Sequence, residues 1–294
     1  MKITKKPQRG GRTFSQITTG ERGTAVIAAG VMLLLAGQVH ATDRLVPSQY
    51  STIQAAATAA VSGDQVIVSP GTYHETITMF SKSVNIISTG GSGVTIIDGT
   101  GLGAQGMLVG FPPAPGLTIQ GFTIQNCAPA SGSGAGIEIF NGTYSVSDLV
   151  VKNNTEPTGS AGGGMYVSSA TGTISNCSFI NNTAVSPSSG GGMYVATGCN
   201  VTISNCLFSG NHADTGAGAM TFAASTTSAT FDTCTFQNNT AAFTGGGSYS
   251  GGPSATVLYT NCTYDGNHAP YGAGAGVFNG FSNTFSHCHF MNNV

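Results

Sequence analysis

The segment ISNCSFINNTAVSPSSGGGMYV, residues 174–195, has near-copies on both sides of it, and this repetition decides the fold. When the copies are aligned on their cysteine, successive copies lie 26 to 29 residues apart. An internal period of that length is typical of a solenoid, in which each repeat packs only against its neighbours. The aligned column contains Phe122, Leu149, Cys177, Cys206, Cys234, Cys262 and Cys288.

The spacing inside one repeat predicts three short strands. Cys177 and Phe179 are two residues apart, so on a strand their side chains share a face. Ile174 lies three residues before Cys177, and a corner at residues 175 and 176 restores the alternation, because Asn tolerates the left-handed conformation. A variable loop and a glycine run then lead into a third strand, GMYV. Such a repeat makes one coil of a parallel β-helix, with neighbouring coils stacked about 4.8 Å apart.

Two further columns follow from this alignment. The asparagine column is expected to be structural, because stacked amides satisfy each other's hydrogen bonds on neighbouring coils. It contains Cys127, Asn154, Asn182, Asn211, Asn239, Asn267 and Asn293. An inward column after the glycine runs contains Ile137, Met165, Met193, Met220, Ser248 and Gly276.

The five cysteines of the aligned column are expected to form a mostly reduced, buried ladder, and disulfide pairing within the column remains the alternative. Their spacing fits no CxxC pair and no zinc pattern. Cys127 and Cys199 lie outside this column. His212 and His268 share a column, but Thr240 lies between them, so they stand too far apart to share a metal ion. His287 and His289 are interpreted as a surface pair. No metal and no cofactor are therefore expected.

The strand-corner-strand unit LTIQGFTIQN, residues 117–126, resembles that of right-handed parallel β-helices of the pectin-lyase-like kind. Residues 46–77 resemble the usual start of secreted members of that group. This resemblance implies a short helix over residues 51–60 that plugs the open end of the coil, and a first strand over residues 64–68. The later repeats pair F-x-x-N with GGGM or GAGA, and they resemble the passenger repeats of polymorphic outer-membrane proteins of the chlamydial type.

The chain is expected to be exported. A basic leader precedes the apolar run GTAVIAAGVMLLLAG, and Val39 and Ala41 have the spacing that a signal peptidase reads. We therefore predict a signal peptide over residues 1–41, a cap of the solenoid over 42–62, irregular early coils over 63–130 and regular coils over 131–294. The mature chain is expected to have no transmembrane helix and to be secreted or held at the cell surface, for example at an outer membrane.

Composition argues against several functions. Only 7% of the residues are charged and the net charge is −2, so no nucleic-acid partner is expected. Glycoside hydrolysis needs two carboxyl groups about 5 to 9.5 Å apart. From residue 131 onward Lys152 is the sole strong base, Glu156 and Asp214 are placed in variable loops, and no pair of acids shares a strand face. The early residues Asp64, His74, Glu75 and Asp98 leave room for a small site, but their spacing matches no motif that identifies one. No catalytic residue is assigned, although a polysaccharide lyase or glycoside hydrolase remains the alternative.

One outward column suggests a binding function. Met165 and Met193 point inward, so Tyr166 and Tyr194 point outward, and the aligned positions are Glu138, Thr221, Tyr249 and Val277. In enzymes of the resembling fold, the equivalent sheet carries the substrate groove. Glu138, Tyr166, Tyr194 and Tyr249 are therefore the candidate ligand-binding residues for a polysaccharide or a cell-surface partner. The alternative is that aromatic and β-branched residues simply suit an exposed parallel sheet.

The sequence ends with CHFMNNV, inside a repeat and directly after its asparagine. The last coil is therefore expected to lack a C-terminal cap and to expose unpaired strand edges. We expect either a longer natural product or end-to-end self-association. The whole pattern predicts an all-β, exported, non-catalytic β-helix module, adhesin-like and acting at a surface.

Overall fold

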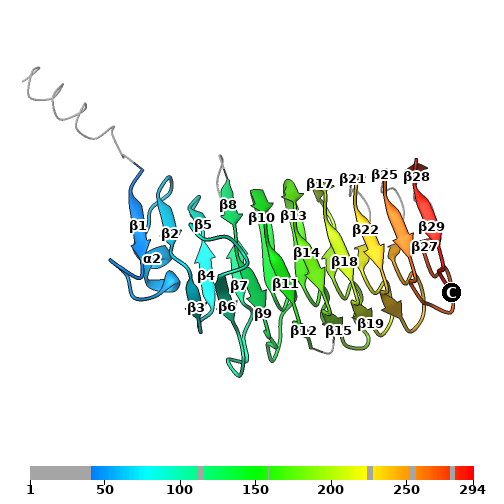
Figure 1. Cartoon of the computed structure of the whole chain (residues 1–294), viewed down its shortest axis with the longest axis horizontal. Helices are drawn as coiled ribbons and strands as arrows, with labels where there is room; N and C mark the ends of the chain where they lie inside the picture. The colour runs from blue at the N-terminus through cyan, green and yellow to red at the C-terminus, as the bar shows by residue number, and fades with distance from the viewer. Residues whose placement is uncertain (1–40, 111–115, 158, 224–227, 252–255, 279–281) are drawn as a thin grey trace, which may run out of the picture. The chain divides into compact units, whose positions relative to one another are not determined.

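The computed structural model describes residues 41–110, 116–157, 159–223, 228–251, 256–278 and 282–294. Apart from Ala41, the predicted signal peptide lies outside the described residues. Residues 41–294 form one unit, an all-β solenoid with one short helix, α2, near its beginning. Figure 1 shows the coils stacked in chain order from β1, beside α2, to β29. The predicted fold class is confirmed.

Each coil contributes parallel strands to three faces. The first, which we call the tyrosine sheet, is formed by β4 (Ile77–Phe80), β7 (Met107–Gly110), the first halves of β10 (Ile137–Ser147) and β13 (Met165–Ser175), β16 (Met193–Val195), β20 (Met220–Ala223), β24 (Ser248–Gly251) and β27 (Ala275–Phe278).

The second face is formed by β1 (Asp43–Val46), β2 (Gln65–Val68), β5 (Asn85–Ser88), β8 (Leu117–Gln120), the second halves of β10 and β13, β17 (Asn200–Ser204), β21 (Ser228–Asp232), β25 (Thr256–Thr260) and β28 (Ser282–Ser286). Because β10 and β13 each run through 11 residues, they join the first two faces into one 16-stranded sheet.

The third face is formed by β3 (Gly71–Tyr73), β6 (Thr95–Asp98), β9 (Thr123–Gln125), β11 (Val150–Lys152), β14 (Ser178–Ile180), β18 (Leu207–Ser209), β22 (Thr235–Gln237), β26 (Thr263–Asp265) and β29 (His289–Met291). A short four-stranded sheet follows it in the regular coils, formed by β12 (Thr155–Glu156), β15 (Thr183–Ala184), β19 (His212–Ala213) and β23 (Thr240–Ala241).

The corners between the second and third faces have the predicted conformation. Asn176 has φ of 54°, and Gly121, at the matching place two turns earlier in the alignment, has φ of 82°. Asp148 occupies the same corner with φ of 55°, so its role is in the turn, as expected. Short polar side chains and glycine adopt the left-handed region at the least cost, which explains why these residue types recur here.

The interior is filled by ladders of identical side chains. The rings of Phe179 and Phe208 stack with centroids 4.9 Å apart, and Phe208 and Phe236 stack at 5.0 Å. The cysteines of the aligned column lie beside them with free thiols. Hydrogen bonding to a neighbouring thiol and burial together raise the pKa of Cys206 to about 12. The thiolate of Cys206 is therefore disfavoured, and this side chain is an inert packing residue in the structure.

The asparagine column forms a continuous hydrogen-bonded ladder inside the solenoid. Nδ2 of Asn182 donates to Oδ1 of Asn211 at 3.0 Å and to the carbonyl oxygen of Val151 at 2.9 Å. The same pattern recurs from Asn154 to Asn293, and the amide N–H of Cys127 donates to Oδ1 of Asn154. Since Asn154 and Asn182 are fully buried, satisfying their amides is a condition for the fold.

The glycine runs are required by the close approach of neighbouring coils. A Cβ at Gly164 would lie 2.4 Å from the carbonyl oxygen of Gly192 and 3.0 Å from Nδ2 of Asn182. Gly162 has φ of 78°, and a Cβ there would lie 2.4 Å from the carbonyl oxygen of Met165. The glycine cluster and the asparagine ladder are therefore two sides of one packing arrangement.

The capping helix was predicted over residues 51–60, and α2 covers Ile53–Ala59 with Thr52 as its N-cap. Ile53, Ala56 and Ala57 are buried, so this face of the helix closes the hydrophobic core. The prediction that the strands begin at residues 64–68 was incomplete, because β1 (Asp43–Val46) precedes α2 and pairs in parallel with β2. Its short, half-charged sequence, DRLV, gave no periodic signal.

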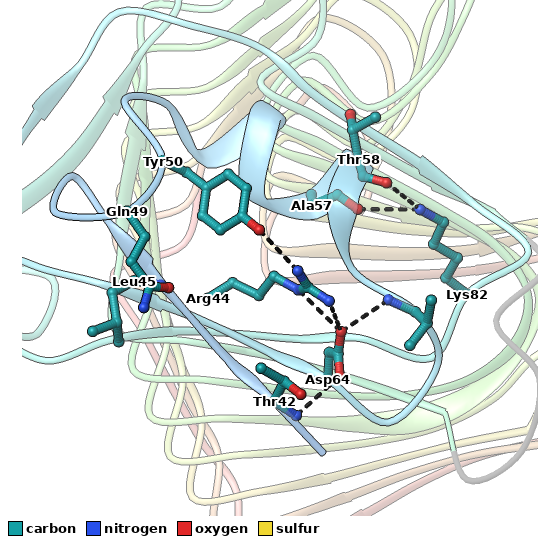
Figure 2. A network of polar contacts seen from close by, with 10 residues as sticks. Thr42, Arg44, Leu45, Gln49, Tyr50, Ala57, Thr58, Asp64 and Lys82 are labelled. Atoms are coloured by element: carbon teal, nitrogen blue, oxygen red, sulfur yellow. Dashed lines mark hydrogen bonds and ion pairs between the residues drawn. The ribbon is translucent and has the colours of Figure 1, made fainter. Parts of the chain in front are cut away.

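Charged side chains of the early coils fix this cap in place. Figure 2 shows the guanidinium group of Arg44 between the hydroxyl of Tyr50, 2.8 Å away, and Oδ2 of Asp64, 2.7 Å away. Burial opposes ionisation of Asp64, but hydrogen bonds from the Val61 amide, from Arg44 and from Thr42 outweigh it and lower its pKa. Nζ of Lys82 donates to the carbonyl oxygens of Ala57 and Thr58 (Figure 2).

Candidate functional site

The predicted outward row exists on the tyrosine sheet. In register, Glu138 lies beside Tyr166, Tyr166 beside Tyr194, and Tyr194 beside Thr221. Met165 and Val167 on either side of Tyr166 are fully buried, so the tyrosine points out of the sheet. The rings of Tyr166 and Tyr194 stack with centroids 5.5 Å apart and planes 11° apart. The structure thus brings these two candidates together as one stacked aromatic pair on the outer side of the sheet.

Two members of the predicted row are placed differently. Thr221 is only 2% exposed, and its hydroxyl accepts a hydrogen bond from the Ala217 amide, so the row is interrupted between Tyr194 and Tyr249. Val277 does not belong to the row, because Tyr249 pairs with Gly276 and the inward Ser248 pairs with Ala275. The last step of this column is one residue shorter than the alignment assumed, so the assignments of Gly276 and Val277 were wrong by one position.

Glu138 forms the acidic end of the stacked tyrosines. Its carboxylate accepts a hydrogen bond from Nε2 of Gln105, which also donates to the carbonyl oxygen of Ser133 at 2.6 Å. Burial raises the pKa of Glu138, and the bond from Gln105 opposes that rise. The carboxylate is therefore already partnered by a neutral amide and held beside Tyr166.

A hollow of about 280 Å³ lies beside the two stacked rings. Its walls come from loops that precede the tyrosine strands on three successive coils, and its lining is rich in serine. Hydroxyl groups around an aromatic surface suit a ligand that presents both hydroxyls and C–H faces, as a sugar ring does. The lining includes Ser133, Ser160, Ser188, Ser189, Tyr166 and Tyr194.

Glu156 lies behind this hollow, and its predicted position in a variable loop was wrong. It is on β12 and fully buried, in a column that otherwise contains Ala184, Ala213 and Ala241. Neither carboxyl oxygen has a hydrogen bond of normal geometry, and the hydroxyl of Ser188 is likewise unpartnered. Burial raises the pKa of Glu156 to about 7, although Ser188 and Ser160 lie close enough to oppose the rise.

A second aromatic pair on the same sheet was missed by the sequence reasoning. Gly110 lies in register between Phe80 and Phe140, whose ring centroids are 5.8 Å apart across it. Phe140 follows Glu138 by two residues, so it faces the same side as the tyrosine row. That spacing could have identified it, but Phe80 belongs to an early coil with no clear repeat. The outward aromatic surface therefore extends from β4 to β16.

The acids of the early coils do not converge on one another. The carboxylate of Glu75 accepts the amides of Ile53 and Gln54 at the start of α2, while Asp64 binds Arg44 in the cap. Burial opposes ionisation of Asp98, but hydrogen bonds from Thr100, Gln125 and Asn126 lower its pKa to about 2. His74 contacts the carbonyl oxygen of Asp98 rather than its carboxylate. Each group has a local structural partner.

The histidine column has the predicted separation. His212 pairs with Thr240, and Thr240 in turn with His268. Nε2 of His212 lies 2.9 Å from Asp214, whose pKa is lowered by the Ser186 amide and by His212. Within the described part of the chain, no three His, Cys, Asp or Glu side chains are grouped closely enough to hold a metal ion. No helix among those residues is both long and apolar enough to cross a membrane.

Comparisons with known proteins agree with this architecture. The sequence profile of the family described as "Right handed beta helix region" matches residues 80–294. A comparison with curated proteins gives no significant match. Among solved structures, pectate lyase Pel9A is similar with a TM-score of 0.54 and 13% identity, covering 87% of this chain and 78% of that chain. The pectin methylesterase from Aspergillus niger has a TM-score of 0.47 and 13% identity, covering 85% and 87%.

Proposed function

This chain belongs to the right-handed β-helix family, and on that scaffold we propose that it is an exported, non-catalytic module that binds a polysaccharide through its tyrosine sheet. The stacked pair Tyr166 and Tyr194 carries the proposal. An aromatic stack with hydroxyl groups beside it matches a sugar, whose C–H groups contact the uncovered parts of the rings while its hydroxyls form hydrogen bonds.

The extent of the surface supports a polymer as the ligand. From Phe80 to Tyr249 the outward aromatic side chains are spread over seven successive coils, with gaps at Gly110 and Thr221, and at about 4.8 Å per coil they span about 29 Å. The hollow beside the tyrosines is lined by serine and backbone groups, and no charged side chain among the described residues lines it. Several weak contacts along one chain would then add up to useful affinity.

The adhesin-like part of the proposal has a different basis. It depends on the resemblance of the F-x-x-N and GGGM repeats to passenger repeats of polymorphic outer-membrane proteins, and on the basic and apolar leader that favours export. On this view the glycan belongs to a cell surface or to the matrix around it. The lyase or hydrolase alternative would require turnover of the bound polymer.

The test is a glycan-array screen of the purified protein, followed by titration calorimetry with any glycan that binds. The triple variant Y166S/Y194S/Y249S is expected to lose binding at least ten-fold while keeping its unfolding midpoint near that of the unchanged protein. Leu258→Ser is the matched control, because it removes an exposed apolar side chain from β25 on another face. Equal binding by all three proteins would refute the site. Release of reducing or unsaturated sugar ends would establish an enzyme instead.

A further inference from the structure

The charges around the tyrosine sheet bear on which glycan the proposed site can hold. Outside the first 40 residues the sequence has three Lys or Arg against ten Asp or Glu. An excess of negative charge repels anionic ligands even before they contact the protein. The placement of the three basic residues therefore matters more than their number.

None of the three basic side chains serves the tyrosine sheet. Arg44 is bound to Asp64 and Tyr50 in the cap, and Lys82 donates to carbonyl oxygens at the end of α2. Lys152 is on β11, in the third face, where it pairs in register with Gln125 and Ile180. No histidine lines the hollow beside Tyr166 and Tyr194. Within the described part of the chain, no positively charged side chain at the hollow would compensate a bound carboxylate for the hydration that it loses.

The acids at the site disfavour an anion and are not free to form a direct ion pair with a ligand. Glu138 lies next to Tyr166, so its carboxylate disfavours an approaching anion. That carboxylate is already hydrogen-bonded to Gln105, while Glu156 is enclosed behind the serines of the hollow and its raised pKa favours the uncharged form. What remains exposed to a ligand is aromatic carbon, hydroxyl and backbone.

From this arrangement we infer that the glycan bound at the tyrosine sheet is an uncharged hexose polymer, and that polyuronates are excluded. The inference rests on the proposed function and specifies its ligand class. It also separates this chain from the named structural neighbours, whose names refer to pectin. The difference comes from the side chains that project from the shared fold, not from the fold itself.

The experiment compares three soluble hexasaccharides of different charge: a neutral β-glucan hexamer, a galacturonate hexamer and a glucosamine hexamer. Calorimetric titration of the protein over residues 42–294 at pH 7 is expected to show the neutral hexamer binding at least ten-fold more tightly than the galacturonate hexamer. Raising the salt from 20 to 500 mM should leave the affinity for the neutral hexamer within two-fold, because screening changes only charge-dependent binding.

A variant with an added positive charge tests whether the lack of a cation is what excludes polyuronates. Ser168 follows Tyr166 by two residues on β13 and faces the same side, so Ser168→Lys adds one positive charge at the row. This variant is expected to bind the galacturonate hexamer at least five-fold more tightly than the unchanged protein. If the unchanged protein prefers the galacturonate or the glucosamine hexamer, the inferred ligand class is wrong, although glycan binding stands. If no hexamer and no arrayed glycan binds, the proposed function itself fails, and the inference with it.

Discussion

The asparagine ladder makes the strongest quantitative prediction about this solenoid. The side chain of Asn211 makes hydrogen bonds to both neighbouring coils. Its Nδ2 donates to the carbonyl oxygen of Phe179 and to Oδ1 of Asn239, and its Oδ1 accepts from the backbone amide and from Nδ2 of Asn182. Asn211 is fully buried, so water cannot replace these partners at no cost when the side chain is removed.

The cost of Asn211→Ala follows from the groups left behind. The amide N–H of Asn182 loses its partner altogether, which costs about 1 to 3 kcal/mol for a buried group. The other three lost bonds leave groups that keep at least one partner or neighbour, and each contributes about 0.5 to 1.5 kcal/mol. Since these effects share one network and do not add fully, we expect a total loss of about 3 to 5 kcal/mol.

The measurement is urea unfolding followed by far-UV circular dichroism, with the slope of free energy against urea compared between variants. Asn205→Gly is the control, because Asn205 is an exposed asparagine in the same coil with φ of 52°, where glycine is well tolerated. Asn211→Asp should be at least as damaging as alanine near pH 7, because a carboxylate would face two oxygen acceptors. A loss below about 1 kcal/mol for Asn211→Ala, or one equal to that of the control, would refute the reasoning.

Three other predictions concern Glu156, the thiols and the last coil. Because burial raises the pKa of Glu156 from 4.5 to about 7, the protonated folded state is favoured; its stabilisation is complete below about pH 4.5 and is lost as the pH rises through 7. Glu156→Gln should therefore flatten the fall of the melting temperature over that range, and parallel curves for both proteins would contradict this. Thiol titration should find the six buried cysteines unreactive when folded and all seven reactive after unfolding without reductant, whereas fewer than seven would reveal disulfides. Phe290 and Met291 are about half exposed on β29, so sedimentation should show concentration-dependent association that F290S/M291S weakens; a monomer at all concentrations would exclude it.

The interior of the fold was predictable from the sequence because every coil repeats the same constraint. A residue such as Asn182 must satisfy its amide against the coils on both sides, so its identity recurs at the period of the coil. The same holds for the ring ladder through Phe208 and for the corner at Asn176. The period itself indicates the parallel stacking of coils, and two apolar residues at positions i and i+2 indicate which face of the strand points inward.

The candidate site was only partly predictable, since outward residues carry no such constraint. Tyr166 and Tyr194 could be assigned because they follow inward methionines, but the alignment could not show that Thr221 would be covered or that Phe80 would reach Phe140 across Gly110. The alignment also could not place Glu156 on a strand, because a polar residue after the ladder asparagine is usually interpreted as part of a loop. Irregular positions depend on side-chain packing between particular coils. A repeat pattern shows only what the coils have in common, so it does not predict that packing.

Glu156 places a carboxyl group at an inward position that holds alanine on the following coils, and this position lies next to the outward aromatic surface. Its column holds a buried alanine on each of the three following coils. A carboxyl group there, without a hydrogen bond of normal geometry, costs stability that alanine would not, so its presence is not explained by packing. Ser160 and Ser188, which lie near this carboxyl, also line the hollow beside Tyr166 and Tyr194. Breaks in a consistent pattern tend to mark functional positions, and this break adjoins the aromatic surface for which we propose glycan binding.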